Sequence, residues 1–180
     1  MAKKIGLVPC IVLGLLLSLA AAPADASPGP TAAATARLTP GPLHGAVAAG
    51  LIQRVLEDRV LALTNRQRRA HGCGALRSSL SLRKSARGHT VTMATRGVMS
   101  HQLPGEPRFS TRITRAGYTR WRLVAENVAR GFSGPDAVVR AWMKSPSHRR
   151  NMLNCRLRDL GVGVVLQNGQ LWWTQNFGRR

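Results

Sequence analysis

The hydrophobic and polar positions follow two different periods along the chain. In several segments, apolar residues recur every three or four positions with arginines between them, which is typical of amphipathic helices. The predicted helices cover residues 51–70, 81–95 and 135–144, with shorter ones near 110–115 and from Pro146 onward. Near the C-terminus, two runs rich in Val, Leu and Trp flank Asn168-Gly169, a strong signal for a β-hairpin. Helices followed by an antiparallel hairpin predict an α+β fold.

The N-terminus has the pattern of a secretory signal. Lys3 and Lys4 precede an apolar stretch, and a small-x-small site ends at Ala26. This order of basic, apolar and small residues predicts a signal peptide over residues 1–26 that is cleaved after Ala26. An uncleaved membrane anchor is the alternative. We therefore expect a secreted, extracellular protein.

The rest of the chain divides into a linker and one domain. Residues 27–50 consist mainly of Ala, Pro, Thr and Gly, and such a composition predicts a flexible linker. Order is expected from about Leu51, so that residues 51–180 form a single domain. Nothing in the sequence indicates an oligomer, and we expect a monomer.

Cysteine usage agrees with export. Once the leader is removed, Cys73 and Cys155 are the remaining cysteines. Two thiols in an exported chain predict one disulfide bond. Two unpaired thiols are the alternative, and a zinc site with four cysteine ligands is excluded.

The charge balance is extreme. The chain carries 27 Lys and Arg against 7 Asp and Glu, a net charge of +20. Such a surface attracts anionic cell-envelope polymers and anionic lipid headgroups. No basic stripe alternates with stacking aromatic residues, as a single-strand binder would show, so we expect no specific nucleic-acid partner.

Three polar residues stand out by their surroundings. Glu126 lies in the apolar run "VAENVA", and a carboxylate is rarely buried unless it is paired or bound. Its partner could be an arginine such as Arg112, or it could accept hydrogen bonds from local amides. His101 follows "GVMS", and His148 opens a short helix after Ser-Pro. Each histidine alone could be an ordinary surface residue, whereas together with Glu126 they match a two-histidine, one-carboxylate metal site.

The other residues and motifs give little indication of a catalytic site. His89 shares a face with apolar residues of the second helix, and we expect it in or near the core. The sequence has no G-x-S-x-G elbow and no glycine-rich phosphate loop. Because the two cysteines look structural, a cysteine nucleophile is not expected either.

An ordered series of motifs resembles a known family. The segments are "LTNRQRRAHG", "MATRGVMSH", "RITRAGY", "AENVARG", "AVVRAWMKSPSHRRNML", "LGVGVV" and "LWWTQNFG". Over about residues 55–178, the chain resembles the CAP superfamily, which comprises cysteine-rich secretory proteins, antigen 5, plant pathogenesis-related proteins and bacterial SCP-like domains. The resemblance implies an α-β-α sandwich, with a small, mainly antiparallel sheet between helical layers.

The resemblance also implies a site. In the family, two histidines and two acidic residues form a central cleft that binds zinc or another divalent ion in some members. By motif, the histidines are His101 and His148, and one acid is Glu126. The second acid usually follows the helix tryptophan, here Trp142, where this chain has none. We therefore expect any divalent cation to bind weakly.

Three functions are compatible with these residues. We expect a non-enzymatic module whose ligand is a lipid, sterol or glycan, because family members bind such molecules. One alternative is a metal-assisted hydrolase with Glu126 as the general base. The other is a cationic protein that acts on the envelope or on membranes through charge.

Overall fold

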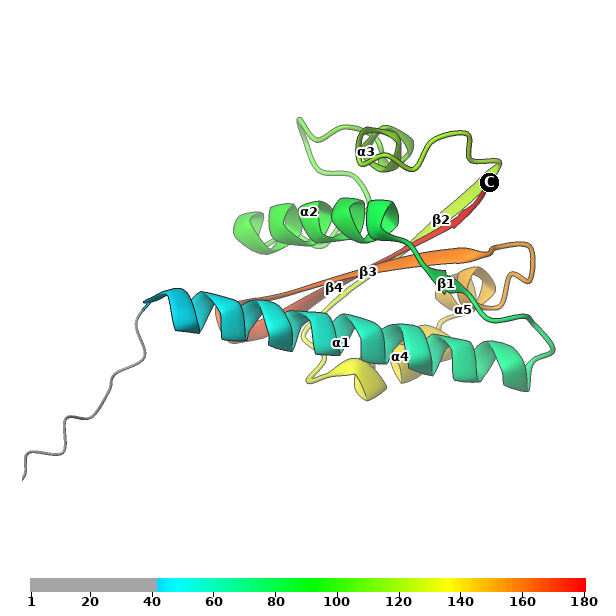
Figure 1. Ribbon diagram of the computed structural model, residues 1–180, viewed down its shortest axis with the longest axis horizontal. Helices are drawn as coiled ribbons and strands as arrows, with labels where there is room; N and C mark the ends of the chain where they lie inside the picture. Colours follow the sequence, from blue (N-terminus) through cyan, green and yellow to red (C-terminus); the bar gives the residue numbers. More distant parts are fainter. Residues whose placement is uncertain (1–41) are drawn as a thin grey trace, which may run out of the picture. The chain divides into compact units, whose positions relative to one another are not determined.

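The computed structural model describes residues 42–180, which form three layers (Figure 1). The elements in chain order are α1 (Pro42–Ala70), β1 (Arg77–Ser78), α2 (Leu80–Arg96), α3 (Phe109–Arg115), β2 (Leu123–Arg130), α4 (Pro135–Lys144), α5 (Pro146–Met152), β3 (Asp159–Gln167) and β4 (Gln170–Arg179). The sheet lies between α2 and α3 on one face and α1, α4 and α5 on the other (Figure 1). This arrangement confirms the predicted α-β-α sandwich.

The sheet has the strand order β1-β3-β4-β2. Strand β4 pairs antiparallel with both β2 and β3, and the two-residue β1 adds a parallel edge. Asn168 and Gly169 join β3 to β4 with φ values of 50° and 72°. Two consecutive left-handed residues are the geometry that Asn-Gly favours in a hairpin turn, so this prediction is also confirmed.

Helix α1 begins earlier than the sequence predicted. It starts at Pro42, so residues 42–50 belong to a helix and not to the flexible linker. Proline suits the first helical position, and this stretch contains several alanines, which are the best helix formers. The high content of Ala, Pro, Thr and Gly had instead predicted a linker for these residues. The predicted signal peptide and the rest of the predicted linker, residues 1–41, lie outside the described residues.

Among residues 42–180, no helix is both long and apolar enough to cross a bilayer.

Three apolar clusters hold the helices on the sheet. On the face of α1 and α4, the largest cluster contains Trp142, Trp173 and Phe177, which are almost completely buried. On the opposite face, α2 lies directly on β3. A Cβ atom added to Gly161 would lie 2.0 Å from the backbone nitrogen of Arg83, so only glycine permits this approach. The close packing fixes α2 relative to the sheet.

The end of α1 is tied to the segment after α5. Cys73 and Cys155 form the predicted disulfide. The fully buried Arg68 donates from Nη1 to the backbone oxygens of Met152 and Asn154, at 2.8 and 3.0 Å. A buried guanidinium requires such acceptors, because an unpaired buried donor is costly. Residues 152–155 are therefore held firmly.

Candidate functional site

Strand β2 presents Glu126 towards α2 and α3. Its neighbours on the same strand face, Val124 and Val128, pack in the clusters beneath these helices. The Glu126 side chain is only 3% exposed. A carboxylate this deeply buried requires charged or hydrogen-bonding partners.

Both carboxylate oxygens of Glu126 have partners. Oε1 lies 3.0 Å from Nδ1 of His101. Oε2 accepts a hydrogen bond from Nη2 of Arg112 at 2.8 Å. Asn176 lies opposite Glu126 on the adjacent strand β4. With its amide oriented so that the oxygen accepts from Ser85, the Asn176 nitrogen donates to Oε2 at 3.1 Å. Arg112, considered from the sequence as one possible partner, is thus the principal one.

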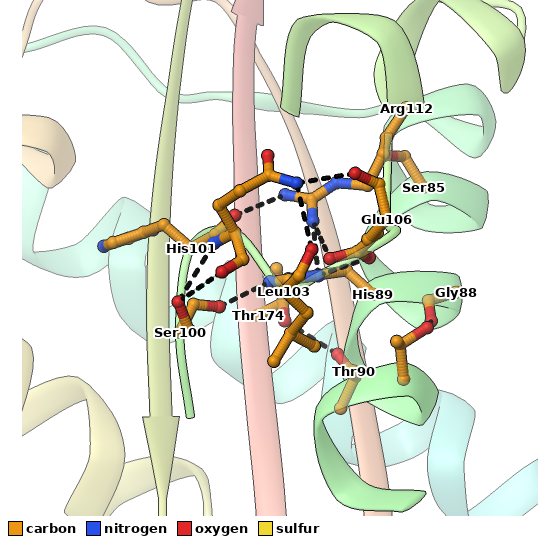
Figure 2. A network of polar contacts seen from close by, with 12 residues as sticks. Ser85, Gly88, His89, Thr90, Ser100, His101, Leu103, Glu106, Arg112 and Thr174 are labelled. Atoms are coloured by element: carbon orange, nitrogen blue, oxygen red, sulfur yellow. Dashed lines mark hydrogen bonds and ion pairs between the residues drawn. The ribbon is translucent and has the colours of Figure 1, made fainter. Parts of the chain in front are cut away.

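A second carboxylate joins this cluster. Glu106 lies with its Oε2 2.9 Å from Nη1 of Arg112 and its Oε1 2.7 Å from Nδ1 of the buried His89. Figure 2 shows Glu106, Arg112 and His89 pointing towards one another between the loop and α2. A second carboxylate therefore lies close to Glu126, although not at the position after Trp142 that the family resemblance indicated. We refer to His89, His101, Glu106, Arg112 and Glu126 as the carboxylate network.

The sequence analysis did not identify Glu106, because the family resemblance indicated a second acid after Trp142. Glu106 instead lies five positions after His101, between Pro104-Gly105 and Pro107. That turn lets the chain fold back over α2. The expectation that His89 lies in the core is confirmed, since it is 1% exposed.

His148 approaches from α5. Ser145 is the N-cap of this short helix, and its Oγ lies 2.8 Å from Nδ1 of His148. Burial, followed by the charge of the nearby His101, lowers the pKa of His148 below its ordinary value of 6.5. His148 is therefore neutral near neutral pH, the state in which imidazole binds metals.

Strand β2 anchors α5 directly. The Asn151 amide donates to the backbone oxygen of Glu126 at 3.1 Å and to Oδ1 of Asn127 at 2.9 Å. Asn127 in turn donates to the backbone oxygen of His148 at 3.2 Å. The position of His148 relative to Glu126 is thus set by a short chain of hydrogen bonds.

The structure brings the three predicted metal ligands together only in part. Among residues 42–180, no group of three or more His, Cys, Asp or Glu side chains is arranged to hold a metal ion. The structure brings Glu126 into contact with His101, and His148 lies near His101. However, the oxygens of Glu126 are occupied, and the positive charge of Arg112 lies 2.8 Å from Oε2. A cation bound to Glu126 would be repelled at short range.

The two imidazoles lie near each other, and both have polar partners. In each, Nδ1 faces a partner, Glu126 for His101 and Ser145 for His148. A carboxylate that accepts from Nδ1–H of histidine fixes the tautomer and leaves Nε2 as the metal-binding nitrogen. The His101 side chain is 58% exposed, so its ring is open to solvent. We call His101 and His148 the histidine pair.

Comparison with known proteins gives consistent results. The model of the cysteine-rich secretory protein family, CAP, matches residues 61–177. The protein YkwD of Bacillus subtilis (strain 168), whose role is uncharacterized, is 35% identical over 125 residues, 68% of this chain and 47% of its own length. YlbC, an uncharacterized membrane protein of the same organism, is 31% identical over 72% of this chain and 36% of its own length. The chain thus spans less than half the length of these curated relatives.

Solved structures share the fold. An extracellular protein with an SCP domain from Bacillus anthracis superimposes with a TM-score of 0.67 at 30% identity, over 72% of this chain and 42% of that one. An outer surface protein of Borrelia burgdorferi gives a TM-score of 0.62 at 22% identity, over 67% of this chain and 90% of that one. With a family model that covers most of the described domain, the chain belongs to the cysteine-rich secretory protein (CAP) family.

Proposed function

We propose that the protein is an exported, non-enzymatic binding module and that the histidine pair is its ligand-contacting site. The single observation behind this proposal is that both carboxylate oxygens of Glu126 already have hydrogen-bond partners. Both of its oxygens accept from neighbouring side chains, and one of those neighbours is the Arg112 guanidinium. A general base needs a lone pair directed at the proton that it removes. The geometry therefore favours binding over metal-assisted hydrolysis.

In this proposal, Glu126 orients His101. The hydrogen bond from Nδ1–H of His101 to Oε1 of Glu126 holds the ring and leaves Nε2 facing outward. Nδ1 of His148 lies 2.8 Å from the Ser145 hydroxyl, which can donate to this nitrogen or accept from it. A divalent cation bound by two imidazoles alone keeps water or a ligand oxygen in its remaining positions. Such a site binds metal weakly and presents it to an incoming ligand.

Export is proposed from the leader-like N-terminus and from the Bacillus anthracis relative, which is an extracellular protein. The net charge of +20 would then face an envelope that is rich in anionic polymers and lipid headgroups. A lipid, sterol or glycan remains the proposed class of ligand for the cleft, on the basis of the family resemblance.

Isothermal titration of the purified domain with Zn²⁺ tests the proposal. We expect weak binding to one site, and loss of that binding in both His101→Ala and His148→Ala. His71→Ala is the matched control, because His71 is an exposed histidine outside the pair. In Glu126→Gln, affinity should fall by about tenfold, the usual effect of removing an outer-shell partner. Equal Zn²⁺ binding by the wild type and His148→Ala would show that the two imidazoles do not share a site.

A further inference from the structure

A separate groove lies on the opposite side of α5 from the chemistry described above. It has a volume of about 540 Å³ and lies between the last turn of α4 and the segment after α5. Three of its lining residues are cationic, Lys144, Arg149 and Arg150. None of its lining residues belongs to the histidine pair or the carboxylate network. We call it the cationic groove.

The charges of the cationic groove are uncompensated. No aspartate or glutamate lines it. Among residues 42–180, no carboxylate forms an ion pair with Lys144, Arg149 or Arg150, whereas the exposed Arg54, Arg59 and Arg77 all have acidic partners. Three cations around one concavity repel one another, and an anion bound between them relieves that repulsion.

The remaining surface of the groove is largely apolar. Met143, Pro146 and Leu153 contribute to its lining, and Met143 also packs against the main core cluster. A volume near 540 Å³ falls within the usual range for small-ligand sites, about 300–1,000 Å³. The combination of a basic edge and an apolar surface matches a molecule with an anionic head and an apolar tail.

The groove is also rigid. Arg68 holds the backbone of Met152 and Asn154, and the disulfide at Cys155 follows immediately. Proline at the first position of α5 limits movement of the other wall. A wall that is already ordered loses little entropy when a ligand binds, which favours affinity.

We propose that the cationic groove binds a phosphate-bearing amphiphile. The phosphate would lie between Lys144, Arg149 and Arg150, because guanidinium groups match phosphate oxygens in a bidentate manner. The apolar chain would lie on Met143, Pro146 and Leu153. The same chemistry is offered by a membrane phospholipid and by a soluble alkyl phosphate ester.

Titration calorimetry at physiological salt concentration tests this assignment with three probes: monomeric short-chain phosphatidic acid, short-chain phosphatidylcholine and inorganic phosphate. The test variant is Arg149→Glu/Arg150→Glu. Its matched control is Arg115→Glu/Arg120→Glu, which changes the net charge equally at exposed positions outside the groove. All four arginines are exposed, and circular dichroism confirms that both variants fold.

We expect the wild type to bind phosphatidic acid at least about tenfold more tightly than phosphatidylcholine, whose net charge is zero, and than inorganic phosphate, which lacks an apolar chain. The groove variant should lose at least about tenfold in affinity, and the control less than about threefold. Sedimentation with vesicles that contain phosphatidic acid then distinguishes the sources: binding supports a membrane lipid, and binding of the monomer alone supports a soluble ester.

Equal losses in the two double variants would overturn the proposal, because net charge alone would then explain binding. Inorganic phosphate that binds as tightly as phosphatidic acid would also overturn it, since the apolar lining would contribute nothing. If phosphatidylcholine binds as tightly as phosphatidic acid, the three cations do not select an anionic head, and the proposal is also overturned.

Discussion

Replacement of Arg112 by methionine should strongly destabilise the protein. Arg112 lies between two buried carboxylates, at 2.9 Å from Glu106 and 2.8 Å from Glu126, whose side chains are 7% and 3% exposed. It also donates to the backbone oxygen of His101 at 3.2 Å and contacts Nδ1 of His89. Removing one partner of a buried ion pair typically costs about 3–5 kcal/mol, because the other charge stays buried without compensation.

The expected loss in the free energy of unfolding is therefore about 3–5 kcal/mol for Arg112→Met. That is a large part of the total stability of a domain, which is commonly about 5–15 kcal/mol. Equilibrium unfolding in urea, followed by tryptophan fluorescence, measures the change. Arg115→Met is the matched control, since Arg115 is exposed on the same helix, and it should change stability by less than about 0.5 kcal/mol.

A double variant sharpens the test. In Arg112→Met/Glu126→Gln, one of the two uncompensated carboxylates is replaced by a neutral amide. The double variant should be less destabilised than the sum of the single variants, with a coupling energy of about 1–3 kcal/mol. If Arg112→Met costs no more than Arg115→Met, or if the effects of Arg112→Met and Glu126→Gln are additive, the proposed coupling in the carboxylate network is refuted.

Two further predictions concern the frame around the site. The disulfide closes a loop of sequence separation 82, so Cys73→Ser/Cys155→Ser should lower the free energy of unfolding by about 4–5 kcal/mol in the chain-entropy model, and urea midpoints that match the wild type would contradict it. Burial, reinforced by a 2.7 Å hydrogen bond to Asp159, raises the pKa of Tyr118 above its ordinary value of 10.0. Neutral Tyr118 therefore stabilises the fold below about pH 10, and this contribution is lost as the pH rises through the folded-state pKa. Because Tyr118 is the only tyrosine, absorbance should show no tyrosinate in the folded protein at about pH 11 but a normal titration in urea; the same titration in both states would disprove the predicted shift.

Local patterns predicted most of the fold. The Asn168-Gly169 turn fixed the register of the hairpin, and helical periodicity located α2 to within about one residue at each end. The prediction for α1 differed because composition cannot separate an alanine-rich linker from an alanine-rich helix. Pro42 was the available signal, since proline is common at the first position of a helix.

The site was predicted only in part, and the reason is physical. Glu126 was conspicuous because a charge among apolar neighbours demands a partner, and Arg112 could be considered as that partner. Glu106 carried no such signal, since it lies in a loop where a carboxylate is ordinary. Its burial depends on the chain folding back over α2, which follows from tertiary packing and not from any local pattern.

The central claim is that Glu126 orients His101 so that the histidine pair presents two outward-facing Nε2 atoms. The most direct test is ¹⁵N NMR of the imidazole nitrogens near neutral pH, during titration with Zn²⁺ and in Glu126→Gln. We predict that Nδ1 of His101 carries the proton, that Zn²⁺ shifts Nε2 of His101 and His148 together, and that Glu126→Gln weakens the tautomer preference of His101. An unprotonated Nδ1 in wild-type His101, or a Zn²⁺ response in which the two histidines titrate independently, would contradict it.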